Sequence, residues 1–235
     1  LDRAAIRQRH ACLGALGSIG NGDRGLDTDV LARRRRRGTA TTSATAEEIG
    51  RIVTEAGASF VGKTVTDELA FSVNGQNAHF GSPINGAAPD RISGGSSSGS
   101  ASAVSNGLCD FALGTDTGGS VRAPANHCGL IGLRPTHGRV SLRGALDMAP
   151  SLDTCGWFAR DIDTFDRVGE VLLGEDAQPL PSQVRLLRSP QLDDLLLSPA
   201  KPAVLAAMEQ VVNRLGAAHV LPADAFDIES MYWSV

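Results

Sequence analysis

The sequence lacks the features that mark membrane-spanning, secreted and metal-bound proteins. No apolar run approaches the roughly 20 residues that a bilayer-spanning helix needs. The first residues show no basic stretch followed by an apolar core and a small-residue cleavage site. The four cysteines, Cys12, Cys109, Cys128 and Cys155, have the spacing of neither a zinc ribbon nor a dense disulfide framework. We therefore expect a cytoplasmic protein that uses no metal ion and no other cofactor.

An excess of positive charge is also missing. The chain has 22 lysine and arginine residues against 26 aspartate and glutamate residues, which gives a net charge of −4. This balance does not indicate a general attraction to nucleic acid or to an anionic membrane. With 235 residues, 42% of them hydrophobic, the chain can bury the core of one domain or of part of a larger one. We expect a small-molecule ligand, and a homodimer is left open.

Two clusters of small residues dominate the middle of the chain. The first is GGSSSGS at residues 94–100, and the second is TDTGGS at residues 115–120. Glycines let the backbone turn tightly and present bare N–H groups, while serines supply hydroxyls. A hydroxyl nucleophile needs a base within reach and donors for the oxyanion, and the clusters could supply all of these except the final base. The alternative, a flexible Gly/Ser-rich linker, is disfavoured because apolar runs lie between and after the clusters.

This part of the chain closely resembles the signature of the amidase signature family. The order GGSS, then GTDTGGSVR, then CGLIGLRPTHGRVS is matched almost without gaps. The resemblance implies that Ser120 is the nucleophile and that Ser96, 24 positions earlier, is the family's second serine, at a cis peptide bond. It also implies an oxyanion hole of backbone N–H groups and two supporting residues. The implied oxyanion donors are Thr117, Gly118, Gly119 and Ser120, and the supporting residues are Asp116 and Arg122.

The resemblance implies an α/β fold with a mixed, twisted central sheet covered by helices. It also implies that a neutral lysine takes the proton of Ser96, which relays the proton of Ser120. Ser120 would attack the amide carbonyl, and water would later hydrolyse the acyl-serine intermediate. The closest likeness is to the shorter amidases, including those that act on indole-acetamide-like substrates. The family does not use histidine as its base, so His79, His127 and His137 are expected to be structural.

The chain departs from the family pattern in two places. No lysine precedes Lys63, and Lys63 lies on a different segment from the family's lysine, so the lysine base is not found. The resemblance also implies a long C-terminal part of the family domain, which we expect this chain to lack. Three hypotheses follow: an amidase whose copy has lost its lysine, a catalytically dead amide-binding fragment, and the amidase subunit of a glutamyl-tRNA amidotransferase-like complex.

Residues 1–44 differ from the rest of the chain. They show little periodicity and contain five consecutive arginines at residues 33–37. Such a run has three interpretations: a patch that binds nucleic acid or another anion, a solvated disordered tail, or the product of GC-rich DNA translated out of frame. We prefer the last interpretation, and we assign residues 45–235 to a partial amidase signature domain.

After residue 45 the local patterns predict alternating helices and strands. Thr45 and Glu48 form a capping box, which predicts a helix that ends near Gly57. The segment at residues 57–64 matches the P-loop pattern, but it follows a helix instead of opening one, so a nucleotide site is not expected. The remaining predicted elements are strands at 58–62, 130–133, 184–187 and 219–221, helices at 162–173 and 199–215, and a short helix and a strand between the two small-residue clusters.

The out-of-frame hypothesis makes a prediction about the coding DNA. Translation of all three frames should reveal, in another frame upstream of residue 45, a segment with the family's Lys-Asp pair. Sequencing of the parent DNA is the measurement. If no frame encodes such a segment, the hypothesis is wrong.

Overall fold

A computed structural model describes residues 10–14, 47–143, 145–174, 186–196, 199–222 and 225. The chain divides into two units, Leu1–Asp176 and Ala177–Val235. Each unit is described by itself. The first unit holds both small-residue clusters, and its core is a five-stranded sheet.

The sheet is mixed, with the strand order β2-β1-β3-β5-β4. β1 is parallel to both β2 and β3, whereas β5 is antiparallel to β3 and β4. Two register pairs, Thr115 with Cys155 and Leu133 with Trp157, place the end of β3 beside the start of β5 and the end of β4 beside its middle. The bounds are β1 His10–Gly14, β2 Ser59–Thr64, β3 Phe111–Thr115, β4 Ile131–Leu133 and β5 Cys155–Ala159.

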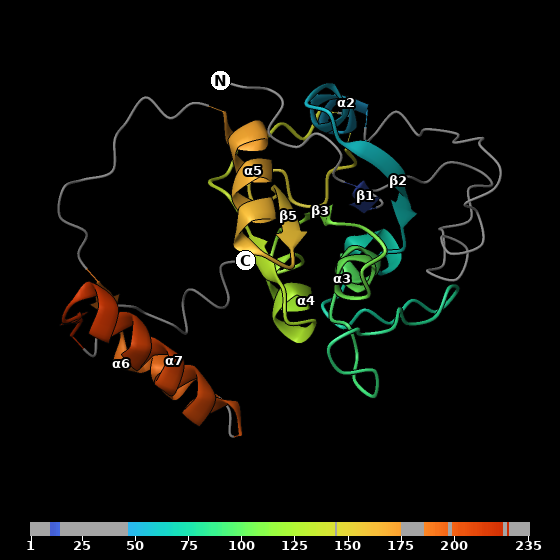
Figure 1. The fold of residues 1–235 in the computed structure, drawn as a ribbon. Helices are drawn as coiled ribbons and strands as arrows, with labels where there is room; N and C mark the ends of the chain where they lie inside the picture. The colour runs from blue at the N-terminus through green and yellow to red at the C-terminus, as the bar shows by residue number, and fades with distance from the viewer. Residues whose placement is uncertain are drawn as a thin grey trace. The chain divides into compact units, whose positions relative to one another are not determined.

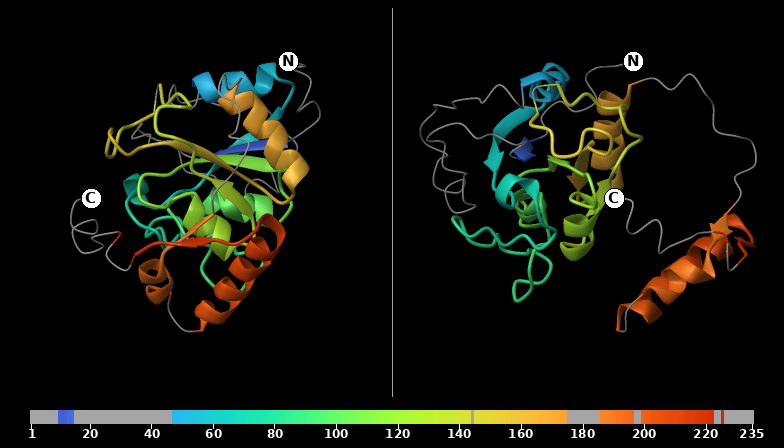
Figure 2. Two further views of the ribbon diagram at one scale, coloured as in Figure 1. Left: turned by 90° about the vertical axis from the view of Figure 1, so that its left-hand side faces the viewer. Right: turned by 180° about the vertical axis from the view of Figure 1, so that it is seen from behind.

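Helices cover both faces of the sheet (Figures 1 and 2). α2 (Glu47–Glu55) and α5 (Ile162–Leu173) pack on one face, where they share a core cluster with Phe111 and Trp157. α3 (Ser98–Ser105) and α4 (Arg122–His127) pack on the other face, in a cluster of smaller side chains. Alternate residues of β3 and β5 point to opposite faces, as a pleated strand requires. The arrangement confirms the predicted α/β fold class.

α3 lies close to the sheet because its residues are small. A Cβ on Gly99 would lie 2.7 Å from the backbone nitrogen of Val65, so only glycine fits at that position. The Ser100 hydroxyl donates to the carbonyl of Leu113 in β3 at 2.8 Å, and buried hydroxyls need such partners. The serines of α3 therefore serve packing as well as the site, and they fix the helix against β2 and β3.

Several predicted elements are observed with shifted ends. The predicted strand at 58–62 is β2, the strand at 130–133 is β4, and the helix at 162–173 coincides with α5. Asp161 caps α5 by accepting from the Thr164 N–H at 2.8 Å. No strand was predicted before residue 45, yet β1 lies there with Ala11 and Cys12 fully buried. The domain boundary at residue 45 stays a prediction, as do the predicted disorder and frame of residues 1–44, of which the structure describes only residues 10–14.

The described residues of the second unit form two short parallel strands and two helices. β6 (Leu187–Arg188) pairs with β7 (His219–Val220), and between them lie α6 (Pro190–Asp194) and α7 (Ala200–Leu215). Arg188 joins these elements, because its guanidinium bonds Asp193 at 2.8 Å and Glu209 at 2.9 Å. The predicted helix at 199–215 is thus α7, and part of the predicted strand at 184–187 lies outside the described residues.

Gly156 should be required for the pairing of β4 with β5. A Cβ at this position would lie 2.1 Å from the carbonyl oxygen of Leu133, which forces the strands apart. We expect Gly156→Ala to lower the free energy of unfolding by about 1–3 kcal/mol, measured by urea unfolding with the fluorescence of the buried Trp157. Gly118→Ala is the control, because a Cβ there meets nothing within 4 Å. Equal stability of the two variants would contradict this account.

Candidate active site

The two small-residue clusters meet at one end of the sheet. The loop at residues 115–120 continues from the end of β3, and the first cluster opens α3. The Ser97 N–H donates to the Ser120 carbonyl at 3.2 Å, and the Ser97 hydroxyl donates to the Thr115 carbonyl at 3.2 Å. Both predicted catalytic serines are buried, Ser96 fully and Ser120 with 5% of its surface exposed. The peptide bond between Gly95 and Ser96 is cis.

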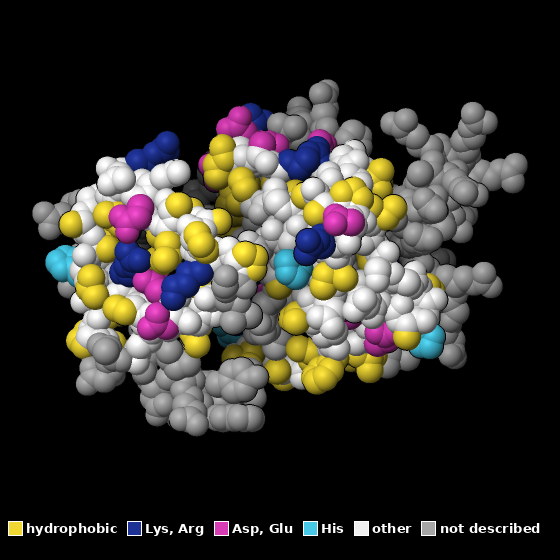
Figure 3. Space-filling view, turned by 90° about the horizontal axis from the view of Figure 1, so that it is seen from below, with side chains coloured by type: hydrophobic (Ala, Val, Ile, Leu, Met, Phe, Trp, Pro, Cys, Tyr) yellow, Lys and Arg dark blue, Asp and Glu magenta, His cyan; other side chains and the backbone are white. Residues whose placement is uncertain are grey.

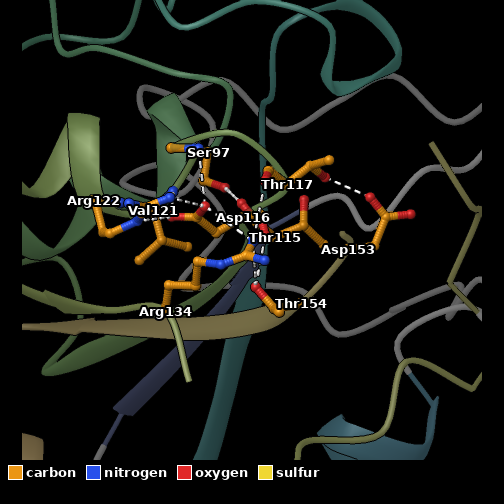
Figure 4. A network of polar contacts seen from close by, with 10 residues as sticks. Ser97, Thr115, Asp116, Thr117, Val121, Arg122, Arg134, Asp153 and Thr154 are labelled. Atoms are coloured by element: carbon orange, nitrogen blue, oxygen red, sulfur yellow. Dashed lines mark hydrogen bonds and ion pairs between the residues drawn. The ribbon is translucent and has the colours of Figure 1, made fainter. Parts of the chain in front are cut away.

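Asp116 organises the second cluster (Figure 4). One of its oxygens, Oδ1, accepts from the Gly119 N–H at 2.9 Å, and Oδ2 accepts from the Val121 and Arg122 N–H groups at 3.1 and 3.2 Å. The Arg122 guanidinium adds two bonds, at 2.9 and 3.0 Å. Burial raises the pKa of Asp116, but the hydrogen bonds and charge of Arg122 and the Val121 N–H outweigh it and hold the pKa below its ordinary value.

A second set of contacts holds the same loop from the side of β4 and β5. Nη1 of Arg134 donates to the carbonyl oxygens of Asp116 and Thr117, and the Thr154 hydroxyl also donates to the Asp116 carbonyl at 2.6 Å. The Thr117 hydroxyl donates to Asp153 at 2.5 Å. These contacts fix the loop through three strand ends, β3, β4 and β5.

Asp153 connects this loop to the segment before β5. Its Oδ2 accepts from the N–H groups of Met148 and Ala149 at 2.9 and 3.0 Å. Burial raises the pKa of Asp153, but bonds from Thr117 and from these N–H groups, with a smaller contribution from the charge of His137, hold the pKa below its ordinary value. Asp153 therefore remains an acceptor for Thr117 at neutral pH.

Four backbone N–H groups were predicted as oxyanion donors, and the structure distinguishes among them. The Gly119 N–H is occupied, because it donates to Asp116. The N–H groups of Thr117, Gly118 and Ser120 have no hydrogen-bond partner among the described residues. A Cβ on Gly118 would meet no atom within 4 Å, so the loop faces open space there. Three donors beside the Ser120 hydroxyl are suited to binding an oxyanion.

The first cluster is held by a buried aspartate that the sequence reasoning did not single out. The Asp67 N–H donates to the Ser96 carbonyl at 3.1 Å, and its Oδ2 accepts from the Gly75 N–H at 3.0 Å. A Cβ on Gly95 would lie 2.3 Å from that Oδ2, so the turn needs glycine. Within the part of the chain that the structure describes, Asp67 Oδ1 and Ser96 Oγ are buried without a partner.

The loop that precedes this cluster is rich in exposed apolar side chains. The Gly95 N–H donates to the Val73 carbonyl at 2.8 Å, which joins the loop to the serine turn. Figure 3 shows hydrophobic side chains in several small groups among polar ones on the face seen from below. The exposed large side chains of the loop are Leu69, Phe71, Val73, Phe80, Ile84 and Ile92.

The sequence was expected to lack the lysine base of the family, and that expectation stays a prediction. The chain has two lysines: Lys63 lies in β2, where its backbone pairs with Leu13 of β1, and Lys201 pairs with Asp194 in the second unit. The three histidines expected to be structural lie in loops or helix ends. His137 Nε2 lies 2.9 Å from the Pro150 carbonyl, and His127 packs against Gly94, where a Cβ would lie 2.4 Å from its Nδ1.

The residues that the structure describes contain neither a candidate metal centre nor a candidate membrane-spanning helix. The described residues contain no group of three or more histidine, cysteine, aspartate or glutamate side chains that could hold a metal ion. None of their helices has the length and apolar character needed to cross a membrane.

Comparisons with known proteins identify the family and the fold. A family model described as Amidase matches residues 41–221. Amidase 1 of Oryza sativa subsp. japonica is 56% identical over 129 residues, which are 55% of this chain and 28% of that protein. One subunit of the glutamyl-tRNA(Gln) amidotransferase of Salinibacter ruber is 50% identical over 122 residues, or 52% of this chain and 24% of that protein. A crystal structure of an amidase superposes with a TM-score of 0.74 at 28% identity, covering 97% of this chain and 51% of that one.

The fold, the paired serine clusters and the matched family model define an amide-hydrolase scaffold. The chain belongs to the amidase signature family, whose enzymes hydrolyse amide C–N bonds. It aligns with only about a quarter of the length of these curated relatives and with about half of the solved amidase.

Asp116 should make stability depend on pH at the acid end. Its folded pKa lies below the ordinary value of about 4, so its carboxylate stabilises the fold above that pH, and the stabilisation is lost as pH falls through the folded pKa. We expect Asp116→Asn to lose about 1–3 kcal/mol of unfolding free energy at pH 7 and to weaken less than the wild type on acidification. Urea unfolding between pH 7 and pH 3 is the measurement.

The control for this experiment is Asp166→Asn, because Asp166 is exposed on α5. It should follow the wild-type pH dependence. An Asp116→Asn variant with the same acid profile as the control would show that the buried carboxylate does not stabilise the loop.

Proposed function

We propose that the chain hydrolyses a small carboxylic amide to the acid and ammonia through an acyl-serine intermediate. The observation that carries this proposal is the set of three unpartnered N–H groups, those of Thr117, Gly118 and Ser120, beside the Ser120 hydroxyl. In this reaction Ser120 Oγ attacks the amide carbonyl carbon, and the carbonyl oxygen becomes an oxyanion that these donors stabilise. Ser96, with its buried and unpartnered hydroxyl, relays the proton of Ser120: it gives its own hydroxyl proton to a base beyond it and receives the proton that Ser120 loses.

Collapse of the intermediate breaks the C–N bond. The proton held on the Ser96 side goes to the leaving nitrogen, so that ammonia departs and the acyl group stays on Ser120. Water then adds to the acyl-serine, its proton returns to Ser120, and the acid is released. Each transfer through Ser96 needs a base beyond it, which is the role of the family's lysine.

The substrate that we propose has an apolar or aromatic acyl group, as in indole-acetamide-like amides. Support comes from the exposed apolar side chains of the loop that bonds to Gly95 through Val73. The net charge of −4 favours no polyanionic partner. A cytoplasmic location and a homodimer stay predictions.

Two other functions remain candidates because specific observations favour them. The absence of a lysine at the family position favours a catalytically dead, amide-binding chain. The likeness to one subunit of a glutamyl-tRNA(Gln) amidotransferase favours a role within a transamidating complex. Binding of an amide without turnover would support the first, and co-purification with other subunits with dependence on glutamine would support the second.

Labelling with a serine-reactive fluorophosphonate tests the proposed nucleophile. We expect peptide mass mapping of the labelled chain to place the label on Ser120, because its hydroxyl lies among the oxyanion donors. Ser120→Ala should remove the label and any amide hydrolysis. Ser96→Ala should lower the labelling rate by about a hundredfold or more, since loss of a proton-transfer partner costs about 10²–10⁴ in rate.

The control is Ser151→Ala, which removes an exposed serine outside the clusters. It should be labelled as the wild type is. Activity that survives Ser120→Ala would show that another residue is the nucleophile, and a folded wild-type chain that takes no label would favour the amide-binding function.

A further inference from the structure

Arg134 lies behind the loop that carries the oxyanion donors. It directly follows β4, and its Nη1 donates to the backbone carbonyl oxygens of Asp116 and Thr117, the second at 3.1 Å. The same nitrogen lies 3.3 Å from the Thr154 hydroxyl and 3.5 Å from Asp116 Oδ1. Only 21% of the side chain is exposed, so water screens its charge weakly.

The two carbonyls that Arg134 contacts share their peptide units with N–H groups of the same loop. The Asp116 carbonyl shares its peptide unit with the Thr117 N–H, and the Thr117 carbonyl shares its unit with the Gly118 N–H. These are two of the three N–H groups that have no partner among the described residues. One cation therefore holds the oxygen ends of two peptide units whose nitrogen ends are left for a ligand.

A cation that bonds a carbonyl oxygen withdraws electron density from the whole peptide unit. The N–H of that unit becomes a stronger donor, and this effect is larger where the local dielectric is low. The bonds also fix the direction of the N–H groups before a substrate arrives, as an oxyanion site requires.

We propose that Arg134 is a positioning residue that orients and polarises the Thr117 and Gly118 N–H groups for an oxyanion. The proposal rests on the proposed function of Ser120. Arg122 has a different task, because its 53% exposed side chain bonds the Asp116 carboxylate. Among the described residues, the Arg122 side chain thus bonds only the carboxylate of Asp116, whereas Arg134 bonds the two peptide carbonyls and makes a longer contact, 3.5 Å, with that carboxylate.

The first test reads the peptide unit directly. The backbone ¹⁵N resonance of Gly118 responds to hydrogen bonding at the Thr117 carbonyl, so the full chain is labelled with ¹⁵N-glycine and its spectrum recorded. We expect Arg134→Gln to shift the Gly118 signal and to leave that of Gly169, in α5, in place. Arg134→Lys, which keeps the charge, should shift it less, and the exposed control Arg143→Gln should not shift it.

The second test reads the chemistry. Loss of a whole oxyanion donor costs about 10²–10³ in kcat, so weakening two donors should lower kcat by about ten- to a hundredfold with little change in KM. Fluorophosphonate labelling of Ser120 should slow by a similar factor in Arg134→Gln and less in Arg134→Lys. Thermal unfolding followed by circular dichroism identifies the variants that fold.

The outcomes separate this proposal from the proposed function. In a folded Arg134→Gln variant, an unmoved Gly118 signal, or an unchanged labelling rate and kcat, would overturn the role of Arg134. A wild-type chain that is neither labelled nor active would overturn the proposed function instead. The Gly118 signal then decides alone: a shift that is smaller in Arg134→Lys supports the role, and no shift overturns it. If Arg134→Gln does not fold, the same readings on Arg134→Lys decide.

Discussion

The site depends on one buried carboxylate. Asp116 is fully buried and accepts from three backbone N–H groups and from two nitrogens of the Arg122 guanidinium. A charge in that position is tolerated only when it is fully bonded, so the chain must wrap around it from residue 116 to residue 122. The carboxylate bonds the N–H groups of Gly119, Val121 and Arg122. The N–H groups of Thr117, Gly118 and Ser120 do not bond it, so they are left for a ligand.

The small side chains of α3 explain why the two serine clusters meet. β3 delivers the second cluster at its end, and α3 begins beside that end because small residues let it approach the sheet. Serine hydroxyls at the start of α3 bond β3 carbonyls directly, as Ser97 does with Thr115 and Ser100 with Leu113. A helix with larger side chains would stand further from the sheet, and Ser96 would then lie further from Ser120.

Contiguous features could be predicted from the sequence, whereas long-range ones could not. The clusters around Ser96 and Ser120 are compact motifs, and α5 has a clear periodicity with a capping aspartate. β1 is too short for a pattern and lies in a segment that differs from the rest. Asp153 acts on a residue 36 positions away and Arg134 on one 17 positions away, so only folding brings them to the loop. The sequence held one signal for Asp153 and Arg134: both lie in segments that resemble the family, and Arg134 lies at the end of the signature.

Among the residues that the structure describes, the two sides of the site differ in how many of their polar atoms have partners. On the side of Ser120, hydrogen bonds to Asp116 and from Arg134 hold the loop that carries the three unpartnered N–H groups. On the side of Ser96 the unpartnered atoms include the hydroxyls of Ser96 and Ser98 and the Oδ1 of Asp67, which an ammonium or another donor would satisfy, because buried polar atoms need partners. In the proposed reaction the proton leaves Ser120 through Ser96, so the proposal depends on which group accepts it on the side of Ser96.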